Sequence, residues 1–189
     1  MSIIDDIFQP FLGKPCWQVE QGYGSFLTFE FGQPTLRITE PHRASKEAPE
    51  SVRKNAARRF VYVRGEWHLW IYMCDWRILQ DDQELANHDS TRRTIKKALI
   101  ELNGQALTKF SLHHSLNCVF EFDLGGKLEI IPNHDDYKET VDLWLLYEPS
   151  GKVFCLRADG KYSHQPGNTP HEEKEWRSLR VSKPKKVVK

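Results

Sequence analysis

The sequence lacks the features that mark proteins that span a membrane, are cross-linked by disulfides or are stabilised by a bound metal ion. In 189 residues it has only four cysteines, and no run approaches the roughly 20 apolar residues that cross a bilayer. The cysteines are far apart and lie in apolar segments: Cys16, Cys74, Cys118 and Cys155. This favours buried, reduced thiols over a disulfide framework. Acidic residues stand near the start, where a secretory signal has basic ones, so we expect a cytoplasmic protein.

Recognised catalytic and metal-binding motifs are missing as well. There is no Gly-x-Ser-x-Gly elbow to make a nucleophile of a serine. His113, His114 and Cys118 would suggest zinc, but the remaining ligands do not follow at any recognised spacing. We therefore predict no catalytic residues, no metal and no cofactor, and we favour a protein that is not an enzyme.

The sequence does contain an internal repeat, which we call the echo. The Thr-Phe-Glu-Phe of residues 28–31 recurs as Val-Phe-Glu-Phe at residues 119–122, and Gly13 and Gly104 are separated by the same 91 residues. Each half then continues through a turn into an alternating strand and a tryptophan-centred strand. The echo predicts an α+β, β-rich fold of two similar antiparallel β units, an internal duplication joined by one helix.

The order of the expected elements divides the chain into parts that together form one compact domain. The alternating strands are expected at residues 36–38 and 128–130, and the later strands around Trp70 and Trp144. The expected parts are a first β unit at 1–89 with a basic insert at 40–64, a connecting helix at 90–104, a second β unit at 105–165, and a polar, basic tail at 166–189.

The connecting helix is predicted from apolar residues at helical spacing, with Asp89 or Ser90 as its N-cap. Those apolar residues are Ile95, Ala98, Leu99 and Leu102. We expect their face to be buried and Trp144 to be a core residue.

Charge is unevenly spread, although the net charge is only +1. The local charge is +5 from residue 43 to 64 and +4 from residue 172 to 189. Four basic residues on an expected helical stretch are candidates for binding a polyanion: Arg53, Lys54, Arg58 and Arg59. A solvated helix face and a solubilising tail are the alternative explanation.

A densely aromatic segment at residues 60–79 predicts one long strand. Because alternate residues face opposite ways, both faces of this strand are largely apolar. Such a strand is either covered on both sides by its own chain or leaves one face for a partner. Since tryptophan, tyrosine and arginine dominate interface hot spots, the candidate contacts are Trp67, Trp70, Tyr72, Trp76 and Arg77.

Within that segment, Cys-Asp-Trp-Arg at residues 74–77 closes an aliphatic-aromatic run and precedes an acidic turn. Residues 121–132 and Leu143-Trp144 then supply a glycine turn, a hydrophobic strand with a following proline, and a tryptophan-containing strand. In this order the chain resembles a family of uncharacterised bacterial proteins with a Cys-x-Trp-Arg strand signature. The resemblance covers most of residues 13–156 and implies a shared scaffold, with no activity attached.

These observations favour a non-enzymatic, cytosolic protein-binding module, with an immunity-type or antitoxin-type inhibitor as one form of it. One alternative is a nucleic-acid-associated protein that uses the basic insert and the tail. The other is an enzyme with an unrecognised site in the aromatic strand. The expected partner is another protein, with nucleic acid and a second copy of the chain as the other candidates, and we expect no membrane association.

Overall fold

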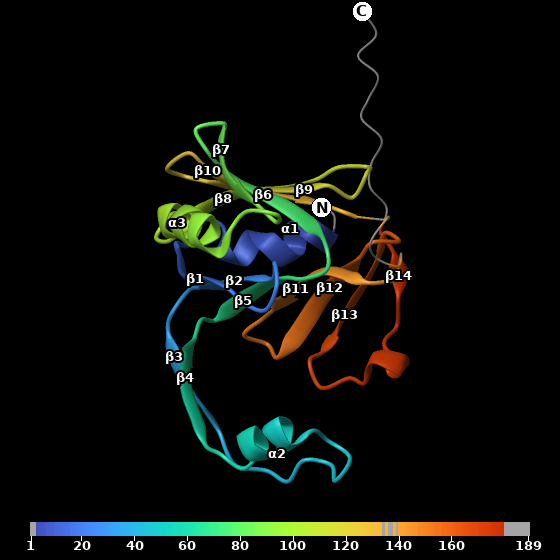
Figure 1. The fold of residues 1–189 in the computed structure, drawn as a ribbon. Coiled ribbons are helices and arrows are strands. Elements are labelled where there is room, and N and C mark those ends of the chain that lie inside the picture. Colours follow the sequence, from blue (N-terminus) through green and yellow to red (C-terminus); the bar gives the residue numbers. More distant parts are fainter. Residues whose placement is uncertain (1–2, 134, 136–137, 139, 180–189) are drawn as a thin grey trace, which may run out of the picture.

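The structure, a computed structural model, describes residues 3–133, 135, 138 and 140–179. It is an α+β fold rich in antiparallel strands, as the sequence predicts. Two sheets form two layers, with helix α1 between them and helix α3 at one side (Figure 1). A two-stranded ribbon projects from one end of this body and is described below as the arm.

The seven-stranded sheet has the order β1 (Cys16–Gln21), β2 (Leu27–Phe31), β5 (Trp67–Ile71), β11 (Asp142–Tyr147), β12 (Lys152–Arg157), β13 (Lys161–Pro166) and β14 (Arg177–Ser178). The five-stranded sheet has the order β7 (Gln83–Asn87), β6 (Asp75–Gln80), β10 (Gly126–Ile131), β9 (Cys118–Phe122) and β8 (Leu107–Leu112). The two-stranded sheet pairs β3 (Thr35–Thr39) with β4 (Phe60–Arg64). Strands β13 and β14 extend the first sheet into the segment expected to be a tail, of which residues 180–189 lie outside the described range.

The helices are short. They are α1 (Ile3–Phe8), η1 (Gln9–Phe11), α2 (Glu50–Ala56), α3 (Arg92–Leu102) and η2 (His171–Glu173). In the part of the chain that the structure describes, none of them has the length and the apolar character needed to cross a membrane.

The core lies between the two layers and is built around aromatic rings. Phe8 of α1 stacks on Phe110 at 3.9 Å between ring centroids and meets Trp144 edge-on at 5.7 Å. Trp144 is fully buried and also stacks on Phe154 at 5.4 Å. The prediction that Trp144 is a core residue is confirmed.

Helix α3 forms where its apolar spacing predicts, and its apolar face is buried against β1 and β7. Its N-cap is Thr91, whose hydroxyl accepts from the backbone N–H of Thr94 at 3.3 Å, so the expectation of Asp89 or Ser90 is wrong by one or two residues. The Ser90 hydroxyl instead accepts from the backbone N–H of Asn87.

The predicted offset of 91 residues reappears in the strand geometry. Strands β8 and β9 begin and end 91 residues after β1 and β2. Their registers agree too, since Cys16 pairs with Phe31 in the first hairpin and Leu107 pairs with Phe122 in the second. Each hairpin also has a register shift near its first residues.

The segments that lead into β1 and β8 pair with each other. The backbone N–H of Gly13 donates to the carbonyl of Leu107, and that of Gly104 donates to the carbonyl of Cys16, both at 2.7 Å. Adding 91 to the donor Gly13 and subtracting 91 from the acceptor Leu107 gives the second bond, so each half of the chain makes the same bond to the other. Both glycines have φ above +80°, a conformation that residues with a Cβ rarely adopt.

The strand that follows each hairpin differs from the expectation. Residues 36–38 were expected as the counterpart of residues 128–130, but β3 lies in the arm and pairs only with β4. The partner of β2 is β5, as the partner of β9 is β10. Each sheet also takes a strand from the other half of the chain, because β11 pairs with β5 and β6 pairs with β10.

The prediction of one strand over residues 60–79 is wrong, because this segment forms β4, β5 and β6 in three different sheets. The first break lies at Gly65, where the chain passes so close to β2 that a Cβ would stand 2.5 Å from the carbonyl oxygen of Phe31. Only glycine allows this approach, so the arm meets the body at a fixed point.

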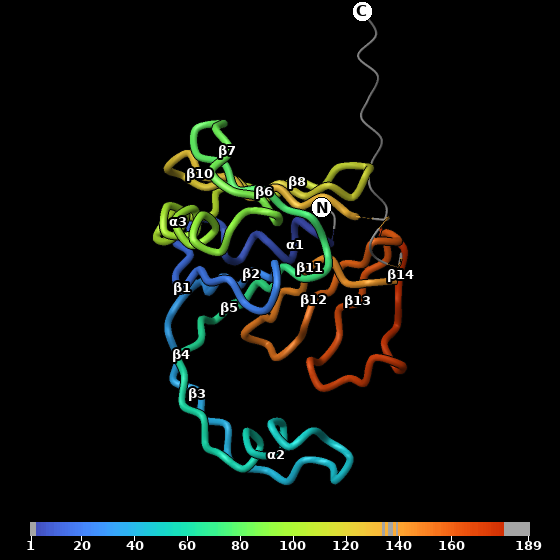
Figure 2. Tube along the Cα trace, viewed as in Figure 1, coloured from blue at the N-terminus to red at the C-terminus, as the bar shows by residue number. Residues whose placement is uncertain are grey.

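The arm comprises residues 35–64, with β3, α2 and β4, and leaves the body between β2 and β5 (Figures 1 and 2). The predicted basic insert at residues 40–64 lies within it. The core clusters of the body include no residue of β3 or β4.

All four cysteines are free and buried, as expected. Burial raises the pKa of Cys16 and of Cys118 to about 12, and it also raises the pKa of Cys74 and of Cys155. These thiols therefore stay protonated near neutral pH, and they act as small apolar side chains.

Candidate functional site

The ribbon of the arm has two unlike faces. Directly opposed residues of an antiparallel pair share a face, and Leu36 is opposite Val63 while Ile38 is opposite Val61. We call these four side chains the aliphatic face. They are exposed by 64%, 41%, 55% and 56% in that order. None of the four packs against a core cluster of the described chain.

The other face of the ribbon is aromatic and basic. Arg37 is opposite Tyr62, and Arg64 is opposite Thr35. Arg37, Tyr62 and Arg64 turn toward the body and line a cavity at the base of the arm. The ribbon therefore separates an exposed aliphatic surface from a polar surface that faces its own chain.

The polyanion candidates lie on or next to α2 at the far end of the arm. Lys54 pairs with Glu50 at 2.8 Å and Arg59 pairs with Glu40 at 2.8 Å, all four side chains being largely exposed. Arg53 and Arg58 form no ion pair with another described residue. Residues 35–64 hold eight basic and three acidic residues, a local charge of +5.

The aromatic candidates do not form one surface. Trp76 is 1% exposed, and its ring N–H donates to the carbonyl of Ser25 at 2.6 Å. Trp67 is half-buried and stacks on Phe11 at 5.7 Å. Arg77 lies on the five-stranded sheet, where its guanidinium donates to Glu129 at 2.5 Å.

Trp70 and Tyr72 lie apart from these, on the outer face of the seven-stranded sheet. Their rings are 5.0 Å apart, and Phe26 is 4.5 Å from Tyr72. They pack beside a small buried cluster that includes Leu145 and is separate from the main core. Half-buried aromatic rings thus cover part of the outer face near the base of the arm.

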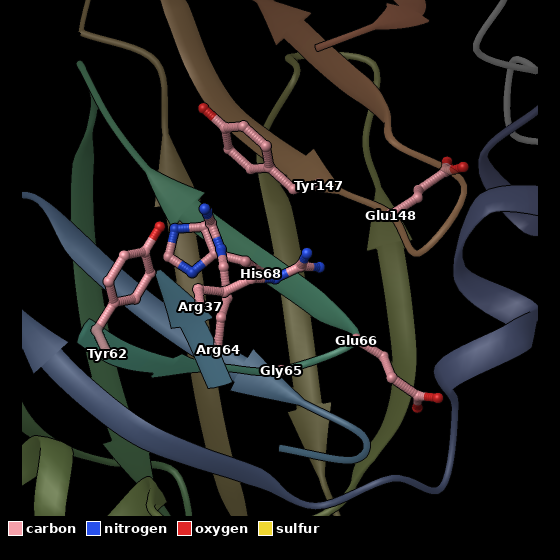
Figure 3. A pocket seen from close by; sticks show the side chains of 8 residues that line it. All are labelled: Arg37, Tyr62, Arg64, Gly65, Glu66, His68, Tyr147 and Glu148. Carbon is pink, nitrogen blue, oxygen red and sulfur yellow. The ribbon is translucent and has the colours of Figure 1, made fainter. Parts of the chain in front are cut away.

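The cavity at the base of the arm has a volume of about 260 Å³. Side chains from the arm and from the body line it (Figure 3): Arg37, Tyr62, Arg64, Gly65, Glu66, His68, Tyr147 and Glu148.

A row of three polar residues crosses three strands beside the cavity, and two of them, His68 and Tyr147, line it. Glu30 of β2 is opposite His68 of β5, which is opposite Tyr147 of β11. One carboxylate oxygen of Glu30 accepts from Nδ1 of His68 at 2.6 Å, and the other accepts from the backbone N–H of Gly65 at 2.8 Å. Glu30 is 6% exposed, so this carboxylate is held by its two donors rather than by water.

The arginines of the cavity have no carboxylate partner, whereas its glutamates contact groups outside the cavity. The Arg64 guanidinium lies 4.8 Å from the centre of the Tyr147 ring, and neither Arg64 nor Arg37 pairs with a carboxylate of a described residue. Glu148 instead contacts Nε2 of His164 at 2.8 Å, and Glu66 lies 4.0 Å from the Lys14 ammonium. Figure 3 shows the carboxylates of Glu66 and Glu148 directed away from the His68 ring.

No pattern in the sequence predicts this cavity. One usable signal was present, since Glu30 is a charged residue between two phenylalanines in a strand of otherwise apolar or small side chains. A charged residue in such a place is buried only with partners. Its partners come from positions 35 to 38 residues further on, and no spacing rule connects them.

Within the described ranges, no three His, Cys, Asp or Glu side chains gather in an arrangement that could hold a metal ion. Comparisons of the chain with protein-family models, with curated proteins and with solved structures give no match. The resemblance carried by the Cys-x-Trp-Arg segment therefore stays a prediction, and function has to be argued from the molecule itself.

Proposed function

We propose that this protein is a non-enzymatic protein-binding module that docks an acidic partner protein through the aliphatic face of its arm. The observation that carries the proposal is the exposure of Leu36, Ile38, Val61 and Val63 on one side of a ribbon. Single exposed apolar residues are ordinary, but contiguous ones mark interaction surfaces because their burial releases free energy.

The charge of the arm indicates the chemistry of the partner. With a local charge of +5, the arm favours a surface that offers an apolar patch rimmed by carboxylates. Two copies of the chain would bring two such charges together, which disfavours a dimer through this face. A nucleic acid would satisfy the charge but would leave the aliphatic side chains in water.

An immunity-type or antitoxin-type inhibitor is one form of this proposal. A ribbon that projects from a rigid body is suited to enter a cleft of its target, and a target bound in this way would be acidic near that cleft. The cytoplasm is the proposed location, because four free cysteines are typical of a reducing compartment.

We infer that the two halves are an internal duplication, and that the arm was added to the first half. The inference is supported by the shared register of the hairpins and by the reciprocal backbone bonds of Gly13 and Gly104. At the same offset α3 corresponds to α1, so α3 begins the second unit rather than joining the two. Only residues 123–125 separate β9 from β10, whereas the whole arm separates β2 from β5. Insertions in loops often carry function.

The test uses cross-linking and co-purification of the full chain from its native host, followed by affinity measurement with the purified partner. The variant Ile38→Ser/Val61→Ser should weaken binding by roughly tenfold or more, because it removes two apolar contacts from the centre of the surface. The matched control is Ile100→Ser/Leu124→Ser, which removes two residues of the body that are equally exposed, at 61% and 67%.

Both variants should unfold at the same denaturant concentration as the wild type. Equal loss of binding in the control, or a partner with no acidic surface, contradicts the proposal.

The nucleic-acid alternative is tested by changing Arg53, Lys54, Arg58 and Arg59 to serine. We expect the wild type to show no retention on DNA or RNA at physiological salt. Retention that weakens in the variant, with a shallower dependence on salt, would instead favour the alternative. A variant that contacts fewer phosphates releases fewer counterions when it binds.

A further inference from the structure

We propose that the cavity between the arm and the body binds the phosphate group of a small phosphate monoester, with Arg37, Arg64 and His68 as its ligands. This site is separate from the aliphatic face, which lies on the opposite side of the same ribbon. The proposal does not depend on a protein partner.

Two guanidinium groups supply the positive charge. Arg37 comes from β3 and Arg64 from β4, and both line the cavity without a carboxylate partner among the described residues. Unpaired arginines that converge on one hollow are the residues that phosphate recognition uses, because each planar guanidinium offers two parallel N–H donors to two phosphate oxygens.

Arg64 is also held in place. Its guanidinium lies on the ring of Tyr147, with 4.8 Å between them, which limits the rotamers it can adopt. Burial raises the pKa of Tyr147, so its phenol stays protonated and remains an O–H donor. The Tyr147 hydroxyl is therefore an uncharged hydrogen-bond donor near Arg64.

His68 is oriented by a buried carboxylate. Glu30 accepts from Nδ1 of His68 at 2.6 Å, and the same carboxylate is fixed by the backbone N–H of Gly65. This places the proton on Nδ1 and leaves Nε2, which contacts no described polar group, for a ligand in the cavity. Nε2 is therefore the His68 atom available to hydrogen-bond a phosphate group in the cavity.

The acidic residues of the lining do not occupy the anion site. Glu148 is bound by His164 and by the hydroxyl of Ser150, and Glu66 accepts from the backbone N–H of Gln33 at 3.2 Å and faces Lys14. Their carboxylates point away from His68 (Figure 3). The repulsion that they would exert on a bound anion is thus reduced by partners of their own.

The volume of about 260 Å³ limits the ligand. Sites for drug-sized ligands occupy roughly 300–1,000 Å³, so this cavity has room for the phosphate group and leaves a larger attached group to lie outside it. Trp70 follows His68 on the same outward side of β5, and its half-buried ring offers a surface on which a planar group of the ligand can stack. Inorganic phosphate and a nucleoside monophosphate are the two sources of such a group.

Binding is measured by calorimetry on the full chain with inorganic phosphate and with adenosine monophosphate. Saturable binding at roughly millimolar concentration or below is expected. The variants Arg37→Gln and Arg64→Gln should each weaken it by about tenfold or more, since a charge-assisted hydrogen bond is lost. The matched control Arg93→Gln removes the same charge from α3, outside the cavity, and should bind as the wild type does.

The variant His68→Gln tests the third ligand and should also weaken binding, while circular dichroism shows that each variant is folded. Tighter binding of the nucleotide, with quenching of tryptophan fluorescence that Trp70→Phe reduces, assigns a nucleoside monophosphate. Equal binding of the two probes assigns phosphate alone.

The proposal is overturned if the wild type binds neither probe, or if Arg93→Gln loses as much affinity as Arg37→Gln. It is overturned as well if a dinucleotide phosphodiester binds as tightly as the monoester. Because Ile38→Ser/Val61→Ser leaves the cavity intact, phosphate binding by that variant separates this site from the proposed protein-docking surface.

Discussion

Strands β2 and β4 have similar amino-acid composition but opposite environments. β2 reads Leu-Thr-Phe-Glu-Phe and is buried at four of five positions, whereas β4 reads Phe-Val-Tyr-Val-Arg and is exposed at its first four. The difference is the second layer: α1 and the five-stranded sheet cover β2, while β4 projects beyond both. A strand of this composition that its own chain leaves uncovered is where a partner gains the most apolar contact.

The two halves of the chain differ in the same way, in the segment that connects corresponding strands. Where the second half turns from β9 to β10 within a few residues, the first half extends the arm between β2 and β5. The body therefore needs no arm to close its sheets. The following measurements test whether arm and body differ as strongly in energy as they do in burial.

The largest difference is expected in thiol reactivity. An added cysteine at Val61→Cys, on the aliphatic face, should react with a thiol reagent at pH 8 orders of magnitude faster than the four native cysteines. Burial raises the pKa of all four native thiols, and their reaction requires opening of the body. Counting reactive thiols against time checks this, and a native cysteine that reacts as fast as the added one contradicts it.

Truncation of a core ring should have the next largest effect. Trp144→Ala is expected to lower the free energy of unfolding by about 3–5 kcal/mol, because it leaves a cavity between Phe8 and Phe154. Urea denaturation measures the loss, with Tyr62→Ala in the arm as the aromatic control. A loss below about 1 kcal/mol would remove Trp144 from the core.

At the junction of arm and body, Gly65→Ala should cost about 1–3 kcal/mol, because the new methyl group would stand 2.5 Å from a backbone oxygen of β2. The same change should weaken phosphate binding, since Gly65 donates to Glu30. Gly22→Ala is the matched control, because its methyl group would make only ordinary contacts at 3.7 Å. Equal stability of the two variants would mean that the backbone at the junction can move to accommodate a methyl group at little cost in free energy.

The smallest effect is expected on the aliphatic face itself. Ile38→Ser should change the free energy of unfolding by less than about 0.5 kcal/mol, because the side chain is already 55% exposed and contacts no core cluster. Denaturant melts of the isolated protein check this. A loss of 2 kcal/mol or more would show that the arm folds back on the body and that its face is not free for a partner.

Much of the local structure could be predicted from the residues alone. The apolar spacing of α3, the basic helix α2 and the hairpins around β2 and β9 follow from patterns that span a few residues. The two hairpins found at the 91-residue offset share one register, which the offset by itself does not specify. The aromatic segment was read as one strand because alternation continues through Gly65, and no local rule marks the close approach that breaks it.

The sequence by itself determined that this chain is β-rich, which residues alternate, and that its two halves echo each other, because side-chain periodicity and turn chemistry act over neighbouring residues. Only the tertiary structure decided which apolar strands are covered. It also decided that His68 and Arg64 line one cavity and that Glu30 holds His68 in place, since these contacts join strands whose pairing depends on the whole sheet. Burial and long-range contact are properties of packing, because large apolar side chains are buried in β2 and exposed in β4.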